Sequence, residues 1–86
     1  MLAEVGRGDR VLCQITSNPY GDTATVALDD AAFSRGSLRV VSHARPGKLF
    51  TASDDLIVAA VGALKPNVMA RIVDAIIAIL RSGQSA

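Results

Sequence analysis

The C-terminal segment constrains the fold most, because its pattern predicts a helix whose wide apolar stripe has to be covered. Pro66 suits the first position of a helix, and Gly83 lies just beyond a last turn that contains Arg81. The apolar residues fall at helical spacing in two adjacent rows, Val68, Ile72, Ile76 and Leu80 in one and Met69, Val73 and Ile77 in the other. So wide a stripe predicts burial on a sheet, contact with another subunit, or both.

The chain before this helix is predicted to form strands. Residues 10–17 and 23–28 alternate as strands do, and residues 29–37 read as a loop or one helical turn. A half-exposed strand is expected over residues 38–44, interrupted by Arg45-Pro46-Gly47-Lys48 because proline cannot donate to a ladder. Extended structure is expected to resume at residues 49–52, and residues 56–64 suit a strand covered on both faces. The predicted fold is mainly β with a C-terminal α-helix, in one domain over residues 1–86 with a lead-in at 1–8 and a frayed tail at 83–86.

The end of the first predicted strand is the most informative site candidate. Alternation places Leu12, Gln14 and Thr16 on one face of this strand, and Asn18-Pro19 and Gly21-Asp22 then stop it. Chemistry is common at such places, because a rigid strand positions a loop. The plain alternative is a strand with two hydroxyls, Thr16 and Ser17, that happen to lie beside a turn.

Composition limits the kinds of protein that this chain can form. With 86 residues, half of them hydrophobic but only three aromatic, the core is expected to be marginal and to favour oligomerisation. Cys13 is the only cysteine, which excludes an intrachain disulfide and predicts a buried structural thiol. No signal peptide or membrane anchor is recognisable in the sequence. We therefore expect a cytoplasmic protein.

The charges are distributed unevenly, although the net charge is only +1. Residues 31–53 hold four basic residues, Arg35, Arg39, Arg45 and Lys48, and no acidic residue. This segment either presents a positive face to phosphates or forms a strand pair whose arginines simply point into solvent. The acidic pairs Asp29-Asp30 and Asp54-Asp55 and the single His43 fit solvated or capping roles better than catalysis or metal binding.

Three ordered blocks carry a resemblance to a known family. They are QITSNPYGD at residues 14–22, GSLRVVSHARPGKLFTA at residues 36–52 and LIVAAVGALKP at residues 56–66. Together they resemble the MazF/PemK-type toxins of bacterial toxin–antitoxin systems, and the likeness runs from about Gly8 to Leu80. The resemblance implies a small SH3-like antiparallel barrel or sheet that forms a homodimer. The given sequence has no match to the family's N-terminal hairpin with its Arg-Arg-Pro segment. Either its start lies inside a longer gene or the protein is a truncated relative, and the fold expected for these residues is N-terminally truncated.

The resemblance also implies an activity. Such toxins are metal-independent endoribonucleases that cleave single-stranded mRNA by attack of the ribose 2′-hydroxyl, need no cofactor, and are silenced by a cognate antitoxin. Thr16 would donate a hydrogen bond to a phosphate oxygen, with Ser17 as the adjacent substitute. The RNA groove would be lined by Gln14, Asn18, Arg45 and Lys48.

The family's catalytic arginine has no matched position here, and Arg7, Arg10 and Arg45 are the conceivable stand-ins. The alternative function is therefore a catalytically inactive relative that serves as a module for dimerisation or antitoxin binding. A third interpretation, a small non-enzymatic barrel that binds another partner, explains the three sequence blocks poorly.

Overall fold

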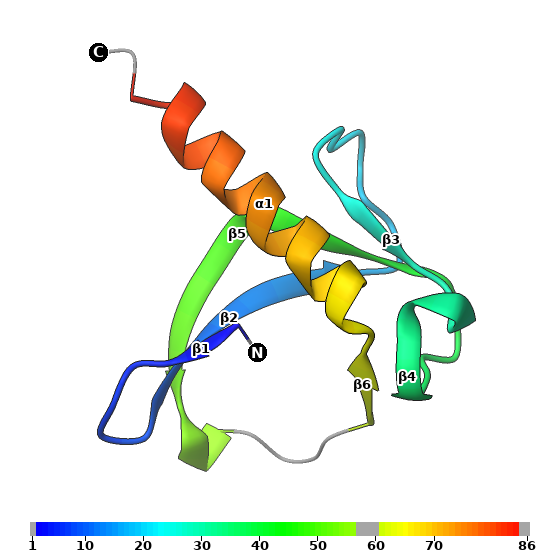
Figure 1. Cartoon of the computed structure of the whole chain (residues 1–86), viewed down its shortest axis with the longest axis horizontal. Coiled ribbons are helices and arrows are strands. Elements are labelled where there is room, and N and C mark those ends of the chain that lie inside the picture. The colour runs from blue at the N-terminus through cyan, green and yellow to red at the C-terminus, as the bar shows by residue number, and fades with distance from the viewer. Residues whose placement is uncertain (1, 57–60, 85–86) are drawn as a thin grey trace.

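The computed structural model describes residues 2–56 and 61–84, and most of its strands belong to one antiparallel sheet. This four-stranded sheet has the order β1-β2-β5-β3. Its strands are β1 (Ala3–Glu4), β2 (Asp9–Thr16), β5 (Ser42–Ser53) and β3 (Val26–Leu28). The long strands β2 and β5 pair at the centre of this sheet, and β1 and β3 lie at its edges (Figure 1). The strand predicted at residues 10–17 is confirmed, and the predicted lead-in contains a short edge strand.

The pairing of β2 with β5 changes register at the Arg-Pro-Gly-Lys segment. Cys13 pairs with Leu49 whereas Gln14 pairs with Arg45, so Pro46-Gly47-Lys48 has no partner in β2. The predicted interruption of the ladder is therefore confirmed, but β5 continues through it as one strand. Pro46 is fully buried, so the residue that cannot donate to the ladder packs inside the fold instead.

A second sheet pairs β4 (Phe33–Gly36) with β6 (Gly62–Leu64). Gly36 has a φ of +69° and lies opposite Gly62, and a Cβ on Gly36 would stand 2.1 Å from the carbonyl oxygen of Val61. This close approach requires glycine.

Four segments of this part of the chain differ from their predicted extents. The segment 29–37 contains β4 after a short 3₁₀ helix, η1 (Asp30–Ala32), rather than only a loop or turn. The strand expected over 38–44 begins only at Ser42, because residues 37–41 form the connection between the two sheets. The strand expected at 23–28 is confirmed only as β3. Of the strand expected over 56–64, β6 is observed, Leu56 ends the 3₁₀ helix η2 (Asp54–Leu56), and residues 57–60 lie outside the described residues.

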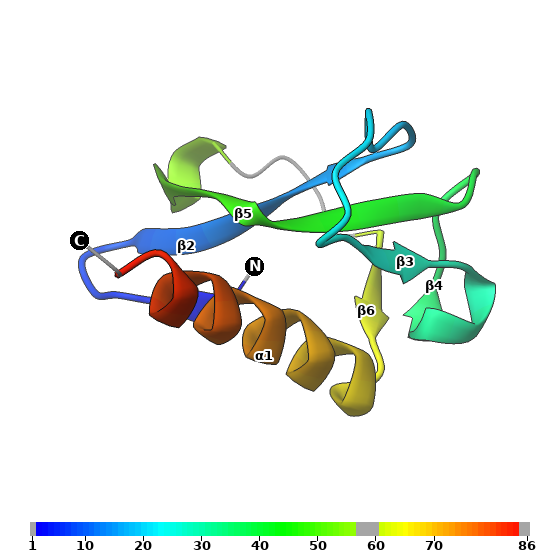
Figure 2. The same cartoon turned by 90° about the horizontal axis from the view of Figure 1, so that it is seen from above.

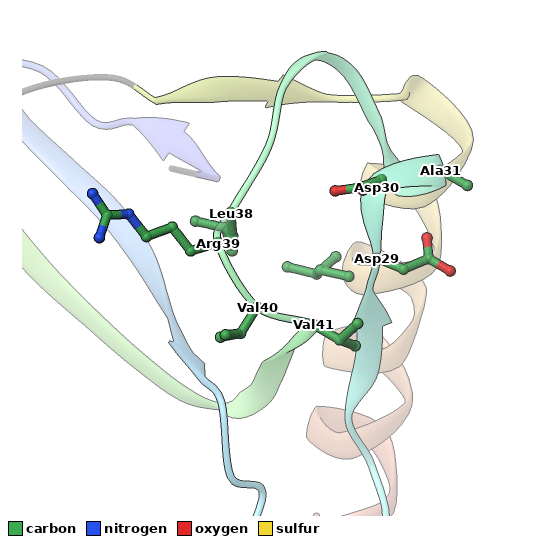
Figure 3. A pocket seen from close by; sticks show the side chains of 8 residues that line it. Asp29, Asp30, Ala31, Leu38, Arg39, Val40 and Val41 are labelled. Atoms are coloured by element: carbon green, nitrogen blue, oxygen red, sulfur yellow. The ribbon is translucent and has the colours of Figure 1, made fainter.

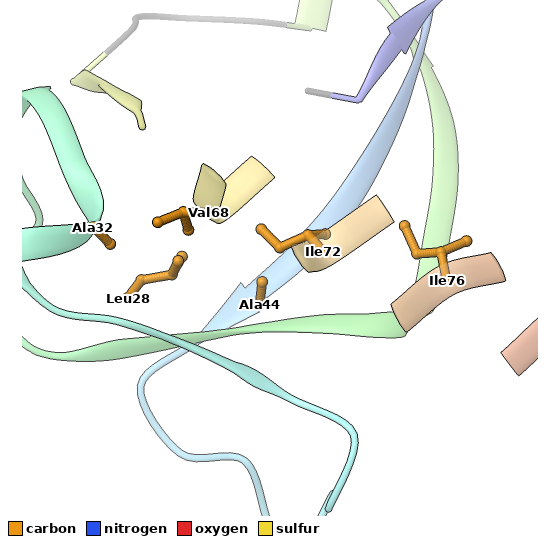
Figure 4. Close-up of a cluster of buried hydrophobic side chains, with 6 residues drawn as sticks. All are labelled: Leu28, Ala32, Ala44, Val68, Ile72 and Ile76. Carbon is orange, nitrogen blue, oxygen red and sulfur yellow. The ribbon is translucent and has the colours of Figure 1, made fainter. Parts of the chain in front are cut away.

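The helix α1 (Pro66–Ser82) crosses one face of the four-stranded sheet (Figure 2) and is confirmed as predicted. Its first apolar row supplies half of the buried core, which Figure 4 shows between α1, β5 and the β3–η1 corner. The core residues are Leu28, Ala32, Ala44, Val68, Ile72 and Ile76. Leu80 and the second row fit the prediction less well, because Val73, Ile77 and Leu80 remain 39%, 42% and 57% exposed.

The predicted fold class is confirmed as mainly antiparallel β-sheet with one C-terminal α-helix. The expected barrel is not observed, since the two sheets are not closed into one within the described residues. The physical reason is that β4 and β6 pair only with each other, so they do not extend the ladder of the larger sheet.

We predict that the small core is sensitive to the truncation of a single buried side chain. Val68→Ala should lower the free energy of unfolding by about 2 kcal/mol, because Val68 is 2% exposed and its removal leaves a cavity against Ile72 and Leu28. The matched control Val5→Ala, at a residue that is 57% exposed, should change it by less than about 0.5 kcal/mol. Urea denaturation followed by circular dichroism measures both, and equal effects of the two substitutions would contradict this core.

Candidate functional site

The candidate site lies on the outer face of the four-stranded sheet, the face turned away from α1. Ala44 is buried in the core beneath α1, and strand alternation turns its neighbours His43 and Arg45 to the opposite side. The register pairs Gln14 with Arg45 and Thr16 with His43. Directly paired residues share a face, so these four side chains form a compact polar array at the end of β2. The face predicted for Gln14 and Thr16 is confirmed.

Arg45 is the cation of this array and is held by two neighbours. Its Nε donates to Asp22 Oδ2 at 2.9 Å, and its Nη1 donates to Gln14 Oε1 at 3.1 Å. A guanidinium carries five N–H donors, so further donors of Arg45 are left to meet an anion. Beneath it, the Cys13 thiol donates to the Arg45 carbonyl oxygen at 3.2 Å, where the register changes. Cys13 packs against the core but is only partly buried, so the predicted buried thiol is confirmed in part, and this burial raises the pKa of the thiol.

Asp22 fastens the loop after β2 to the sheet. The hydrogen bond from Arg45 is the main reason that the pKa of Asp22 lies below its ordinary value, and the Ala24 backbone N–H, which donates to Asp22 Oδ1 at 3.0 Å, lowers it further. The charges of Arg45 and Lys48 act in the same direction. Lys48 is exposed in the unpaired segment of β5 and adds a second cation to this corner.

Thr16 is half-buried, and its hydroxyl is engaged with the turn that follows. Its Oγ1 donates to the Asn18 carbonyl oxygen at 3.0 Å and accepts from the Asn18 N–H at 3.2 Å. The Asn18 side chain in turn accepts from the Tyr20 N–H at 3.1 Å. These contacts agree with the plain alternative of a turn-stabilising hydroxyl, and they also fix the position of Oγ1. Ser17 is exposed just beyond β2.

The three arginines that could replace the family's catalytic arginine, Arg7, Arg10 and Arg45, lie at different distances from Thr16. Arg10 lies at the opposite end of β2 from Thr16 and is ion-paired with Asp54. With a rise of about 3.3 Å per residue, that places the two backbones about 20 Å apart. Arg7 lies in the turn before β2, farther still. Arg45 is diagonal to Thr16 across the strand pair, at a typical backbone separation of about 7–8 Å. Only Arg45 among the three is placed to act with Thr16.

Sequence reasoning missed two members of the array, His43 and Asp22. His43 was expected to be a surface residue, but it is half-buried and lies directly across from Thr16. Its alternation with Arg45 was visible in the sequence, whereas the register that brings it to Thr16 was not. Asp22 was interpreted only as a turn residue, and its ion pair with Arg45 joins positions that are far apart in the chain.

The cavities elsewhere in the described chain are weaker candidates for a catalytic or binding site. A cavity of about 310 Å³ beside η1 is lined by Asp29, Asp30 and Arg39, but their charged groups point apart (Figure 3). A larger one of about 580 Å³ between the two sheets is mostly apolar, with Ile15, Phe33 and Met69 in its wall. Within residues 2–56 and 61–84, no three His, Cys, Asp or Glu side chains are placed to hold a metal ion.

Comparison of the chain with models of known protein families gave no match, and a search of curated proteins gave none either. In the described part of the chain, no helix combines the length and the apolar character needed to cross a bilayer.

We predict that Arg45 dominates the titration of Asp22. Arg45→Ala should raise the pKa of Asp22 more than Lys48→Ala does, because a direct hydrogen bond lowers it more than a nearby charge. NMR titration of the Asp22 carboxyl carbon measures both variants. Because the folded-state pKa is depressed, the stabilising contact is present above the ordinary pKa of aspartate, near 3.9, and is lost as the pH falls through the folded value. An identical Asp22 titration in Arg45→Ala would exclude the ion pair in solution.

Proposed function

We propose that this protein is a toxin of the MazF/PemK type, a cytoplasmic endoribonuclease that cleaves single-stranded mRNA without a metal ion and is silenced by a cognate antitoxin. The observation that carries the proposal is the array on the outer face, where the hydroxyl of the Gln-Ile-Thr-Ser block lies beside an imidazole and a guanidinium. The resemblance of the three sequence blocks supports the assignment to this family. The array supports the activity, because it contains the kinds of group that the proposed reaction needs.

The proposed reaction needs few protein groups, because the substrate provides its own nucleophile. The ribose 2′-hydroxyl attacks the adjacent phosphorus, the bond to the 5′ oxygen breaks, and the products are a 2′,3′-cyclic phosphate and a free 5′-hydroxyl. Thr16 Oγ1 donates to a phosphate oxygen, and Arg45 stabilises the charge that builds on the phosphoryl group. His43 is the array's proton-exchanging side chain, since an imidazole nitrogen can accept a proton and return it.

Two existing contacts have to change for RNA to bind in this way. The Thr16 hydroxyl has to rotate from the Asn18 carbonyl oxygen towards the phosphate, while it can still accept from the Asn18 N–H. Arg45 has to share its charge between Asp22 and the phosphate. Lys48 and the exposed amide of Asn18 lie on the same corner and complete the proposed RNA-binding surface.

We predict that Thr16→Ala slows RNA cleavage about 10²–10³-fold, because one hydrogen-bond donor to the developing charge is lost. The matched control is Thr51→Ala, since Thr51 pairs with Val11 and lies on the opposite face of the sheet from Thr16. The substrate is a long single-stranded transcript of mixed sequence, incubated with EDTA, and the product ends are identified by mass spectrometry.

Growth arrest on induced expression, relieved by Thr16→Ala but not by Thr51→Ala, would support the same function in cells. An intact transcript after incubation with the wild-type protein would refute the nuclease proposal.

A second candidate function, an inactive module for dimerisation or antitoxin binding, is favoured by a different observation. Val73, Ile77 and Leu80 form an exposed apolar stripe along α1, of the kind that a partner covers. In either function we propose that the protein is a homodimer. If the protein is an inactive module, the Thr16 hydroxyl, which is hydrogen-bonded to Asn18, and Arg45, which is ion-paired with Asp22, have structural roles only.

We predict that Ile77→Glu shifts the protein from dimer to monomer in sedimentation velocity, because a carboxylate at the centre of the stripe would be buried without a partner. The control is Ala78→Glu, which adds the same charge at an exposed neighbouring position that lies off the stripe. A wild-type protein that sediments as a monomer at all concentrations would rule out the homodimer.

A further inference from the structure

Tyr20 is the most exposed aromatic side chain in the described structure, at 81%. The other two aromatic residues of the chain are strand residues, Phe33 packed against the core and Phe50 half exposed on β5. Tyr20 therefore adds little to the core, and most of its side chain is open to a ligand.

The turn that carries this ring has a defined backbone conformation. Tyr20 has a φ of +51°, a left-handed conformation that bulky residues rarely adopt. It is fixed by the Tyr20 N–H, which donates to Asn18 Oδ1 at 3.1 Å, and by the Asp22 N–H, which donates to the Pro19 carbonyl oxygen at 2.9 Å. The ring is thus presented by a defined turn rather than by a loose loop.

That turn is tied at both ends to the candidate site. On one side, Asn18 contacts the Thr16 hydroxyl, and on the other, Asp22 is ion-paired with Arg45. Lys48 is close enough to Asp22 to lower its pKa. Proteins bind single strands by stacking bases on exposed aromatic rings while nearby cations contact the phosphates, and this turn carries such a ring two residues before the carboxylate that is paired with Arg45.

We infer that Tyr20 is a stacking platform for a base of single-stranded RNA, next to the phosphate that Thr16 and Arg45 contact. This inference rests on the proposed function, because it assigns the same site a base-binding residue. Stacking needs the face of the ring and not the hydroxyl, so phenylalanine should replace tyrosine whereas residues without a ring should not.

The test is binding of a fluorescein-labelled, single-stranded 2′-O-methyl RNA of mixed sequence, which lacks the nucleophile and is not cleaved. Tyr20→Asn should weaken binding about 5- to 100-fold, and Tyr20→Phe should stay within about twofold of wild type. Asparagine tolerates the left-handed conformation, so Tyr20→Asn removes the ring while keeping the turn. The control is Leu56→Asn, at an apolar residue that is 72% exposed and lies at the other end of the sheet.

A second readout is the intrinsic fluorescence of the protein. Tyr20 is its only tyrosine and it has no tryptophan, so stacking with a base should quench the whole tyrosine signal upon RNA binding. Wild-type affinity of Tyr20→Asn, or unchanged tyrosine emission at saturating RNA, would overturn the inference while leaving the nuclease proposal intact. Failure of the wild-type protein to bind the RNA would overturn both. Tyr20-dependent binding without Thr16-dependent cleavage of natural RNA would support the platform and refute the nuclease.

Discussion

The register between β2 and β5 is the constraint on which the rest of this structure depends. Because Pro46-Gly47-Lys48 is left out of the ladder, Arg45 meets Gln14 and His43 meets Thr16 on one face, while Ala44 and Pro46 are buried. A shift by a single residue would turn every side chain of the strand to the other face. It would bury Arg45 beneath α1 and move Ala44 into solvent. The same pairing thus specifies the core and the polar array, and neither can change without the other.

Arg45 links this sheet to the loop that follows β2. Its guanidinium reaches Asp22 and Gln14, and its carbonyl oxygen accepts from the Cys13 thiol below. The loop after β2 carries few apolar contacts of its own, so its position relies on polar contacts with the sheet and within the turn. A side chain that has this structural task is already oriented before any ligand arrives. This is the preorganisation that a phosphate-binding group requires.

The parts of the fold that sequence could predict are those governed by local rules. The helix was recoverable from Pro66, Gly83 and its apolar rows, and β2 from its alternation. The β4–β6 pair was not, because Gly36 lies in a segment that reads as a loop or turn, and local pattern does not show which partner the strand containing Gly62 would take. The site divides in the same way. Gln14 and Thr16 were placed correctly by strand periodicity, whereas the roles of His43 and Asp22 depend on pairing between distant segments, which periodicity does not encode.

The contacts within the array can be exchanged at modest cost, so their structural role is compatible with the catalytic role that we propose. Asn18 is exposed, so water can replace the Thr16 hydroxyl at its carbonyl oxygen when that hydroxyl turns to a phosphate. An aspartate is ionised near neutral pH even at its ordinary pKa, and the pKa of Asp22 lies lower still, so an incoming phosphate meets this competing anion at Arg45. Binding by Arg45 alone would therefore be weak. Lys48 and a base stacked on Tyr20 would add contacts for which Asp22 does not compete directly. RNA would therefore be held by several weak contacts rather than by one strong ion pair.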